Sequence, residues 1–273
     1  MVKRNSENNC SFGIIKENSF ETRGRFCIFQ NRPLDFILKN MIYIFEGFKK
    51  GVVLLFNLNG EVLAILKLSL GISIFATFIA VCIGLPLGSI IALKKFPFKK
   101  IVIALVNTGM GLPPVVVGLF VVLFLSRNGP LGFLQWLYTP KGMILAQVII
   151  ATPIITGLSL AAVQSFEPRF YRQILALGAT TRQSICILIK EIKLSILAAI
   201  IAGFGSIISE VGAVMMVGGN IKGQTRVLTT ATVLETHMGN FDIAIALGLV
   251  LLLMSFIVNL ALTFIQQSKV KQE

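Results

Sequence analysis

Charged side chains are scarce in this 273-residue chain. They make up 14% of it, against about 25% in soluble domains. Hydrophobic residues make up 55%, and the mean hydropathy is +0.84. This balance excludes an ordinary soluble domain and is typical of a polytopic membrane protein. The net charge is +13, but no basic patch is interleaved with aromatic residues, so the excess predicts basic cytoplasmic loops and excludes nucleic-acid binding.

The residues that carry catalysis or hold metals are also few. The chain has one histidine, His237, and four cysteines without the spacing of a metal-ligand pair. It has no Gly-x-x-x-x-Gly-Lys-Ser/Thr sequence, which excludes ATP binding by a P-loop. A membrane-embedded enzyme would need clustered Asp, His or Cys at membrane depth, where only Glu210 is found. We therefore predict no enzymatic activity, no metal site and no cofactor in this chain.

Five apolar runs are each long enough to cross a bilayer, which takes about 20 helical residues. Four of them carry no charge, and the fifth carries only Glu210. The runs cover residues 68–93, 101–126, 142–166, 194–217 and 243–268. The sequence therefore predicts an all-α polytopic membrane protein with five transmembrane helices.

The loops between the runs alternate in basic content. Residues 94–100 hold four lysines and residues 167–193 hold five basic residues, whereas residues 127–141 and 218–242 hold two each. By the positive-inside rule, the first and third loops and the tail 269–273 are cytoplasmic. Five spans then require an external N-terminus.

Residues 1–40 fit an external N-terminus poorly, because they carry seven basic residues and no long apolar run. We interpret them as an N-terminal extension that lies upstream of the true translation start at Met41. Residues 41–60 would form an interfacial segment, since two lysines and Glu46 disfavour an additional span there. The transmembrane domain is predicted over residues 61–268.

Prolines interrupt the second run at Pro113 and Pro114. Two adjacent prolines remove two backbone donors at membrane depth, which is tolerated only beside protein or a polar cavity. The pair therefore predicts either a bend that lines a solute path or a feature of helix packing.

The run 194–217 carries Glu210 and is followed by a glycine-rich turn. An ionised group at mid-bilayer costs roughly 2.5–3.5 kcal/mol, so it faces the protein interior or a water-filled path. We interpret Glu210 as a gate element that pairs with a helix terminus or with a basic residue of the turn. The turn offers backbone N–H groups and threonine hydroxyls to an anion; the alternative is a structural re-entrant turn. Its candidate path residues are Gly219, Asn220, Thr225 and Arg226.

The loop 167–193 predicts two short amphipathic helices that are separated by a break at Gly178. Phe170, Ile174 and Leu177 fall on one helical face, and a second apolar stripe begins at Ile185. A soluble partner could bind such a protruding pair of helices; the alternative is an interfacial helix that lies on the lipid.

At this break, Leu177-Gly178-Ala179 resembles the coupling loop of ABC-importer permeases. Leu-Pro-Pro-Val-Val-Val-Gly at 112–118 and the stretch 210–230 narrow the resemblance to the molybdate, tungstate and sulfate group of type I permeases. Ser-Glu-Val-Gly-Ala, then Gly-Asn-Ile-Lys-Gly-Gln-Thr-Arg, is most similar to the tungstate permeases. The resemblance covers residues 41–267. It departs from the family pattern at Arg172, where an acidic residue is usual, and at Ile174, where alanine is usual.

The resemblance implies a type I ABC importer permease fold and the permease subunit of an ATP-driven importer for a tetrahedral oxyanion, most closely tungstate. It also implies a second copy of the chain, two ATPase subunits that bind ATP and magnesium, and an external solute-binding protein, in the plasma membrane of a prokaryote. Molybdate and sulfate are alternatives within the group. A non-ABC anion channel is the alternative of another class, which would need a repeated filter or charged ring and no docking loop. The residues that the resemblance places in the ATPase-coupling loop are Arg172, Gln173, Leu177, Gly178 and Ala179.

Overall fold

A computed structural model describes residues 60–165, 176–180 and 190–270, with isolated positions at 41, 45–47, 49, 183 and 187. Over these residues all regular secondary structure is helical, which confirms the all-α prediction. The predicted extension 1–40, most of the segment 41–60 and most of the loop 167–193 lie outside the described residues.

Three helices are long and apolar enough to cross a membrane: α2 (Gly60–Leu93), α5 (Pro140–Gln164) and α11 (Phe241–Val270). Proline suits the first position of α5, because the missing N–H would have no partner there. The side chain of Thr139 caps the same helix by accepting a hydrogen bond from the Gly142 N–H at 3.4 Å. Helix α2 begins before the predicted start at 68, because Lys67, exposed on its surface, continues the helix.

The other two predicted spans are bent. Helices α3 (Lys99–Met110) and α4 (Pro114–Leu125) meet at 98°, and α8 (Lys193–Ile208) and α9 (Gly212–Gly218) meet at 57°. The described residues therefore hold three spans, or up to five if each bent pair counts as one. The first bend follows from Pro113 and Pro114: the backbone of Pro113 is extended (φ −61°, ψ 121°), and α4 starts at Pro114.

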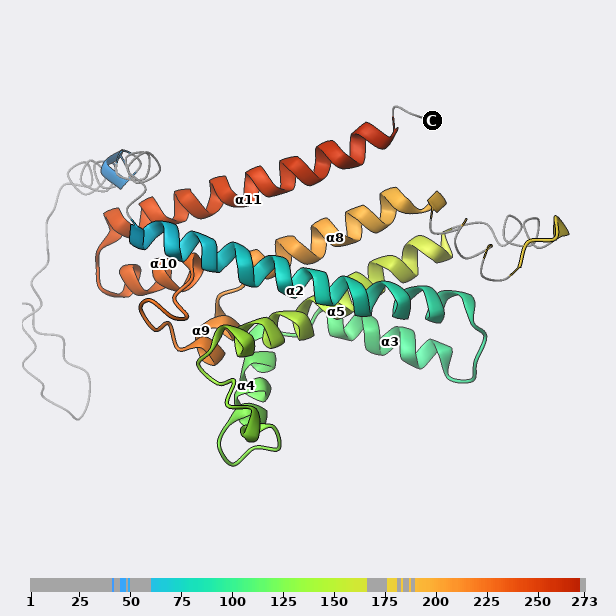
Figure 1. The fold of residues 1–273 in the computed structure, drawn as a ribbon, viewed down its shortest axis with the longest axis horizontal. Coiled ribbons are helices and arrows are strands. Elements are labelled where there is room, and N and C mark those ends of the chain that lie inside the picture. Colours follow the sequence, from blue (N-terminus) through green and yellow to red (C-terminus); the bar gives the residue numbers. More distant parts are fainter. Residues whose placement is uncertain are drawn as a thin grey trace, which may run out of the picture.

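Helices α2, α5, α8 and α11 run side by side along the long axis of the molecule, and α4 turns away from them (Figure 1). Small residues let α2 and α5 approach closely. Ala76 and Ala80 are fully buried, and a Cβ at Gly88 would lie 2.6 Å from the carbonyl oxygen of Thr156. This contact requires glycine and forms the centre of the bundle.

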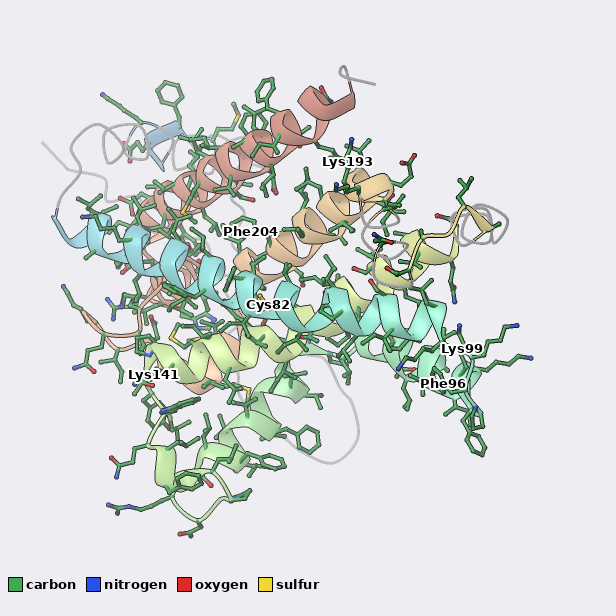
Figure 2. The ribbon with its side chains drawn as sticks, turned by 45° about the vertical axis from the view of Figure 1, so that its right-hand side comes forward. Cys82, Phe96, Lys99, Lys141, Lys193 and Phe204 are labelled. Atoms are coloured by element: carbon green, nitrogen blue, oxygen red, sulfur yellow. The ribbon has the colours of Figure 1, made fainter. Side chains whose placement is uncertain are left out.

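Basic side chains mark the two ends of the bundle. Lys99 follows the turn between α2 and α3, and its Nζ donates to the carbonyl of Ala92 at 2.6 Å, near the C-terminus of α2. Lys99 and Lys193 lie toward one end of the long helices, and Lys141 lies toward the other (Figure 2). The first and third loops therefore share an end, as the alternation of charge predicts.

A short helix, α10 (Leu228–His237), follows the glycine-rich turn and was not predicted. Its first turn, from Leu228 to Ala231, is buried. Leu228 packs with residues of α8 and α11, such as Phe204 and Leu247, in one apolar cluster. Helix α10 thereby holds the turn against the bundle.

Candidate functional site

Glu210 lies at the break between α8 and α9, half-buried. Its backbone N–H donates to the carbonyl of Ile207 at 3.2 Å, and its side-chain Oε1 accepts the N–H of Ala213 at 3.0 Å. The carboxylate therefore caps the N-terminus of α9, where a negative charge is favourable. The sequence predicted that Glu210 pairs either with a helix terminus or with a basic residue such as Arg226. In the structure it pairs with the terminus of α9, and within the described residues no hydrogen bond or ion pair joins it to Arg226.

The proline bend lies directly beside this break, because α4 packs against α9. A Cβ at Gly118 would lie 2.7 Å from the Cα of Ala213, and one at Gly212 would lie 2.7 Å from Val115 Cγ2. The residues that follow Pro114 and Glu210 therefore meet where α4 packs against α9.

A hollow of about 250 Å³ opens at the proline bend. Residues 109–114 form one wall, and residues of α5 and α8, including Ile150 and Ser206, form the other. Pro113 and Pro114, which were predicted to line a path, are among the residues that line this hollow. Its lining is largely apolar, which offers an anion little to bind.

The glycine-rich turn is held together by its own side chains. Thr225 is fully buried; its Oγ1 donates to the carbonyl of Gly218 at 2.6 Å and accepts the N–H of Ile221 at 3.0 Å. Gly219 and Asn220 have positive φ values of 70° and 51°, which suits glycine and asparagine. The side chain of Asn220 donates to the carbonyl of Thr230 at 3.4 Å.

The other threonine hydroxyls of this region are also engaged. Thr229 Oγ1 donates to the carbonyl of Glu210 at 3.2 Å, and Thr230 Oγ1 accepts the N–H of Val227 at 3.1 Å, at the start of α10. In this conformation the hydroxyls bind backbone and are buried. They tie the segment between α9 and α10 to itself and to Glu210.

Arg226 lies at the edge of this turn, against α2. Together with Lys222, Gly223 and Gln224 it faces Ala64, Ile65 and Leu68 across a hollow of about 310 Å³. The Nε of Arg226 is buried and has no hydrogen-bond partner within the described residues. Arg226 therefore lies between the turn and α2.

The described part of the predicted coupling loop lies at the opposite end of the bundle (Figure 1). Gly178 has a φ of 87°, and the side chain of Leu177 is 87% exposed. Thr180 and Gln183 then form a reciprocal capping box: the Thr180 N–H donates to Gln183 Oε1 at 2.8 Å, and the Gln183 N–H donates to Thr180 Oγ1 at 3.4 Å. The chain turns at Leu177 and Gly178, where the break was predicted, whereas Arg172, Gln173 and most of the two predicted short helices lie outside the described residues.

Sequence reasoning missed three buried polar residues beside Glu210. Ser69 and Ser73 lie on α2, and Gln147 lies on α5. Ser69 Oγ accepts the N–H of Leu228 at 3.0 Å and thereby caps α10 from another helix. The sequence did offer a signal for them: two serines spaced i, i+4 lie on one helical face of the first apolar run, and a single glutamine lies inside the third run.

Residues 84–271 match the protein family described as the inner membrane component of binding-protein-dependent transport systems. The tungstate uptake system permease protein TupB of Peptoclostridium acidaminophilum is 41% identical over 227 residues, which is 83% of this chain and 100% of that protein. The protein of the same name from Campylobacter jejuni is 37% identical, covering 82% of this chain and 94% of that protein. The sulfate transport system permease protein CysW of Escherichia coli is 28% identical, covering 69% and 68%.

Solved structures show the same fold. A chain of a bacterial alginate ABC transporter, in complex with its alginate-bound periplasmic protein, matches with a TM-score of 0.70 at 22% identity, covering 87% of this chain and 91% of that one. A chain of the MetNI methionine ABC transporter matches with a TM-score of 0.62 at 16% identity, covering 74% and 92%. These similarities confirm the predicted importer-permease fold.

Proposed function

The chain belongs to the family of inner membrane components of binding-protein-dependent transport systems, and on that premise we propose that it is the permease subunit of a tungstate importer. The observation that carries the choice of anion is the 41% identity to a tungstate uptake permease over that protein's full length. Identity to the sulfate permease CysW is 28%, and to the Haemophilus influenzae molybdenum permease ModB 23%. Molybdate and sulfate are therefore the competing anions. Because the chain belongs to a family of transport-system components, a non-ABC anion channel is no longer an alternative.

The energy for uptake would come from separate ATPase subunits that carry ATP and magnesium. Support comes from the exposed Leu177 and the bend at Gly178, which stand out from the bundle at one end. We expect Arg172, Gln173, Leu177, Gly178 and Ala179 to contact the ATPase. An external solute-binding protein would deliver the anion at the other end.

A second copy of the chain would complete the pathway. Helix α4 leaves the bundle (Figure 1) and exposes the large apolar side chains Leu119, Phe120, Leu123 and Phe124. Four such side chains on a projecting helix suit a partner helix or lipid, and a homodimer would bury them around a shared path. In that arrangement the two proline bends would face one another.

The orientation proposed from loop charge puts the end with Lys99 and Lys193 in the cytoplasm, in the plasma membrane of a prokaryote. The glycine-rich turn and Lys141 would then be external. This orientation agrees with the placement of Leu177 and Gly178 at the cytoplasmic end, where an ATPase could reach them.

In the proposed mechanism, the contact between α4 and α9 acts as the gate. A tetrahedral dianion is repelled by an ionised carboxylate, and Glu210 is held at the N-terminus of α9 by the Ala213 N–H at 3.0 Å. ATP-driven movement of the coupling loops would rock the bundle and shift α4 against α9, opening the path at Pro113 and Pro114. Gly219, Asn220 and Thr225 would keep the turn rigid, and Arg226 would attract the anion to the external end.

The test is accumulation of metals in cells that lack or express this chain, measured by mass spectrometry with trace tungstate and molybdate supplied together. Loss of tungsten alone in the deletion strain is the expected result. Equal loss of both metals would replace tungstate with a general oxyanion as the substrate. Loss of neither would overturn the proposal.

A further inference from the structure

A small chamber lies between the helices of the bundle, beside the break between α8 and α9. Its volume is about 10 Å³, which is room for one water-sized ligand. Polar residues reach it from four sides: Ser69 and Ser73 from α2, Gln147 from α5, Glu210 from the break and Thr229 from α10. Such a convergence inside a membrane domain is costly unless it binds something.

Gln147 shows that the chamber lacks a ligand that its lining needs. The side chain is 4% exposed; its Nε2 donates to the carbonyl of Ile207 at 3.4 Å, and its Oε1 has no partner within the described residues. If the amide group were flipped, Oε1 would face the carbonyl oxygen of Ile207, and two acceptors would repel one another. The atom without a partner is therefore the amide oxygen, which is an acceptor. A buried acceptor of this kind favours a ligand that offers positive charge or a proton.

Two of the three hydroxyl groups at the chamber donate to backbone carbonyls. Ser69 Oγ donates to Ile65 at 2.8 Å, and Thr229 Oγ1 donates to Glu210 at 3.2 Å. Ser69 Oγ also accepts the N–H of Leu228 at 3.0 Å, so Gln147 Oε1 is the buried acceptor of the chamber that is left without a partner within the described residues.

The chamber lining carries charge of both signs: the N-terminus of α10 at Leu228 is positive, whereas the end of α8 and Glu210 are negative. Helix α8 ends at the chamber wall with Ile207 and Ile208, and the C-terminus of a helix carries the negative end of its dipole. Glu210 adds a formal negative charge. No lysine, arginine or histidine is among the described residues that line the chamber.

We propose that this chamber binds one small monovalent cation, such as Na⁺, with Gln147 Oε1 and Ser73 Oγ among its oxygen ligands. Broken membrane helices bind such ions at the C-terminal ends of their half-helices in other transporters. A divalent ion fits poorly, because it favours several carboxylates and Glu210 is the only one here. The ion would join α2, α5 and α10 to the break, and it does not depend on which anion is transported.

Thermal unfolding of the purified importer complex tests the site, in sodium chloride against choline chloride of equal ionic strength. Choline is too large for the chamber. For wild type we expect the Tm to rise by about 3–6 °C in sodium, if Na⁺ is near ten times its Kd. Gln147→Met keeps the length of the side chain and removes Oε1, so this rise should be lost.

The matched control is Ser159→Ala on the same helix. Ser159 is equally buried and its hydroxyl has no partner within the described residues, but it does not line the chamber, so the sodium effect should persist. If Gln147→Met does not fold, Ser73→Ala should require several-fold more sodium for half of the shift. Equal Tm values in the two salts would mean that the chamber holds water and would overturn the proposal. A sodium effect that survives Gln147→Met, or an unchanged midpoint in Ser73→Ala, would also overturn it.

Discussion

Glu210 is the residue on which the proposed gate depends. Glu210→Gln keeps the size of the side chain but replaces a charge-assisted cap of α9 with a neutral one. Losing part of a cap costs about 1 kcal/mol, which is about a fivefold change in an equilibrium between gate states. We therefore expect tungstate uptake to fall several-fold and basal ATPase activity to change in reconstituted vesicles.

The control for this variant is the neighbouring Ser209→Ala. Ser209 is exposed and its Oγ donates only to carbonyls of its own helix, at 2.9 Å to Gly205 and 3.3 Å to Ser206. Its uptake should match wild type. Normal uptake together with unchanged basal ATPase activity in Glu210→Gln would remove Glu210 from the gate.

At the scale of elements, the close contact of α4 with α9 predicts opposite effects for two glycine substitutions. Gly118→Ala puts a Cβ within 2.7 Å of the Ala213 backbone, and overpacking of this kind costs typically about 1–3 kcal/mol. Gly71→Ala on α2 meets nothing within 4 Å and should stabilise the helix. Thermal unfolding should show a lower Tm for Gly118→Ala and an equal or higher Tm for Gly71→Ala; the same sign for both would contradict the packing argument.

The coupling loop allows a test with matched backbone strain. Gly178 and Gly239 have similar φ values, 87° and 80°, and a Cβ on either would meet nothing within 4 Å, but Gly239 lies in the turn between α10 and α11. Aspartate at either position should cost similar stability. Only Gly178→Asp should uncouple ATP hydrolysis from uptake while the protein stays inserted. Equal uptake by both variants, measured against their amounts in the membrane, would count against ATPase docking at residue 178.

The sequence predicted those elements whose signals are local. Charge-free runs are long enough to show each span, and Pro113 with Pro114 shows the bend, because proline removes a donor wherever it lies. Helix α10 was missed because its buried face is only one turn long, from Leu228 to Ala231. The engagement of Thr225 and the acceptor role of Ser69 depend on segments that meet only in the folded chain, so no local pattern reports them.

For the whole molecule, the proposed orientation predicts which surface lysines face the cytoplasm. Lys141 is exposed and Lys99 is half-buried, and they lie toward opposite ends of the bundle (Figure 2). On a cysteine-free background, Lys141→Cys should react with a membrane-impermeant maleimide added outside intact cells, whereas Lys99→Cys should react only after the membrane is opened. Unlabelled cysteine-free protein is the control for background reaction. The reverse pattern would mean the opposite orientation in the membrane, with Leu177 and Gly178 outside, where no ATPase subunit could reach them.

The four lysines of residues 94–100 should help to set this orientation, because positive charge resists translocation during insertion. Neutralising them should weaken the preference for one orientation and give a mixed labelling pattern.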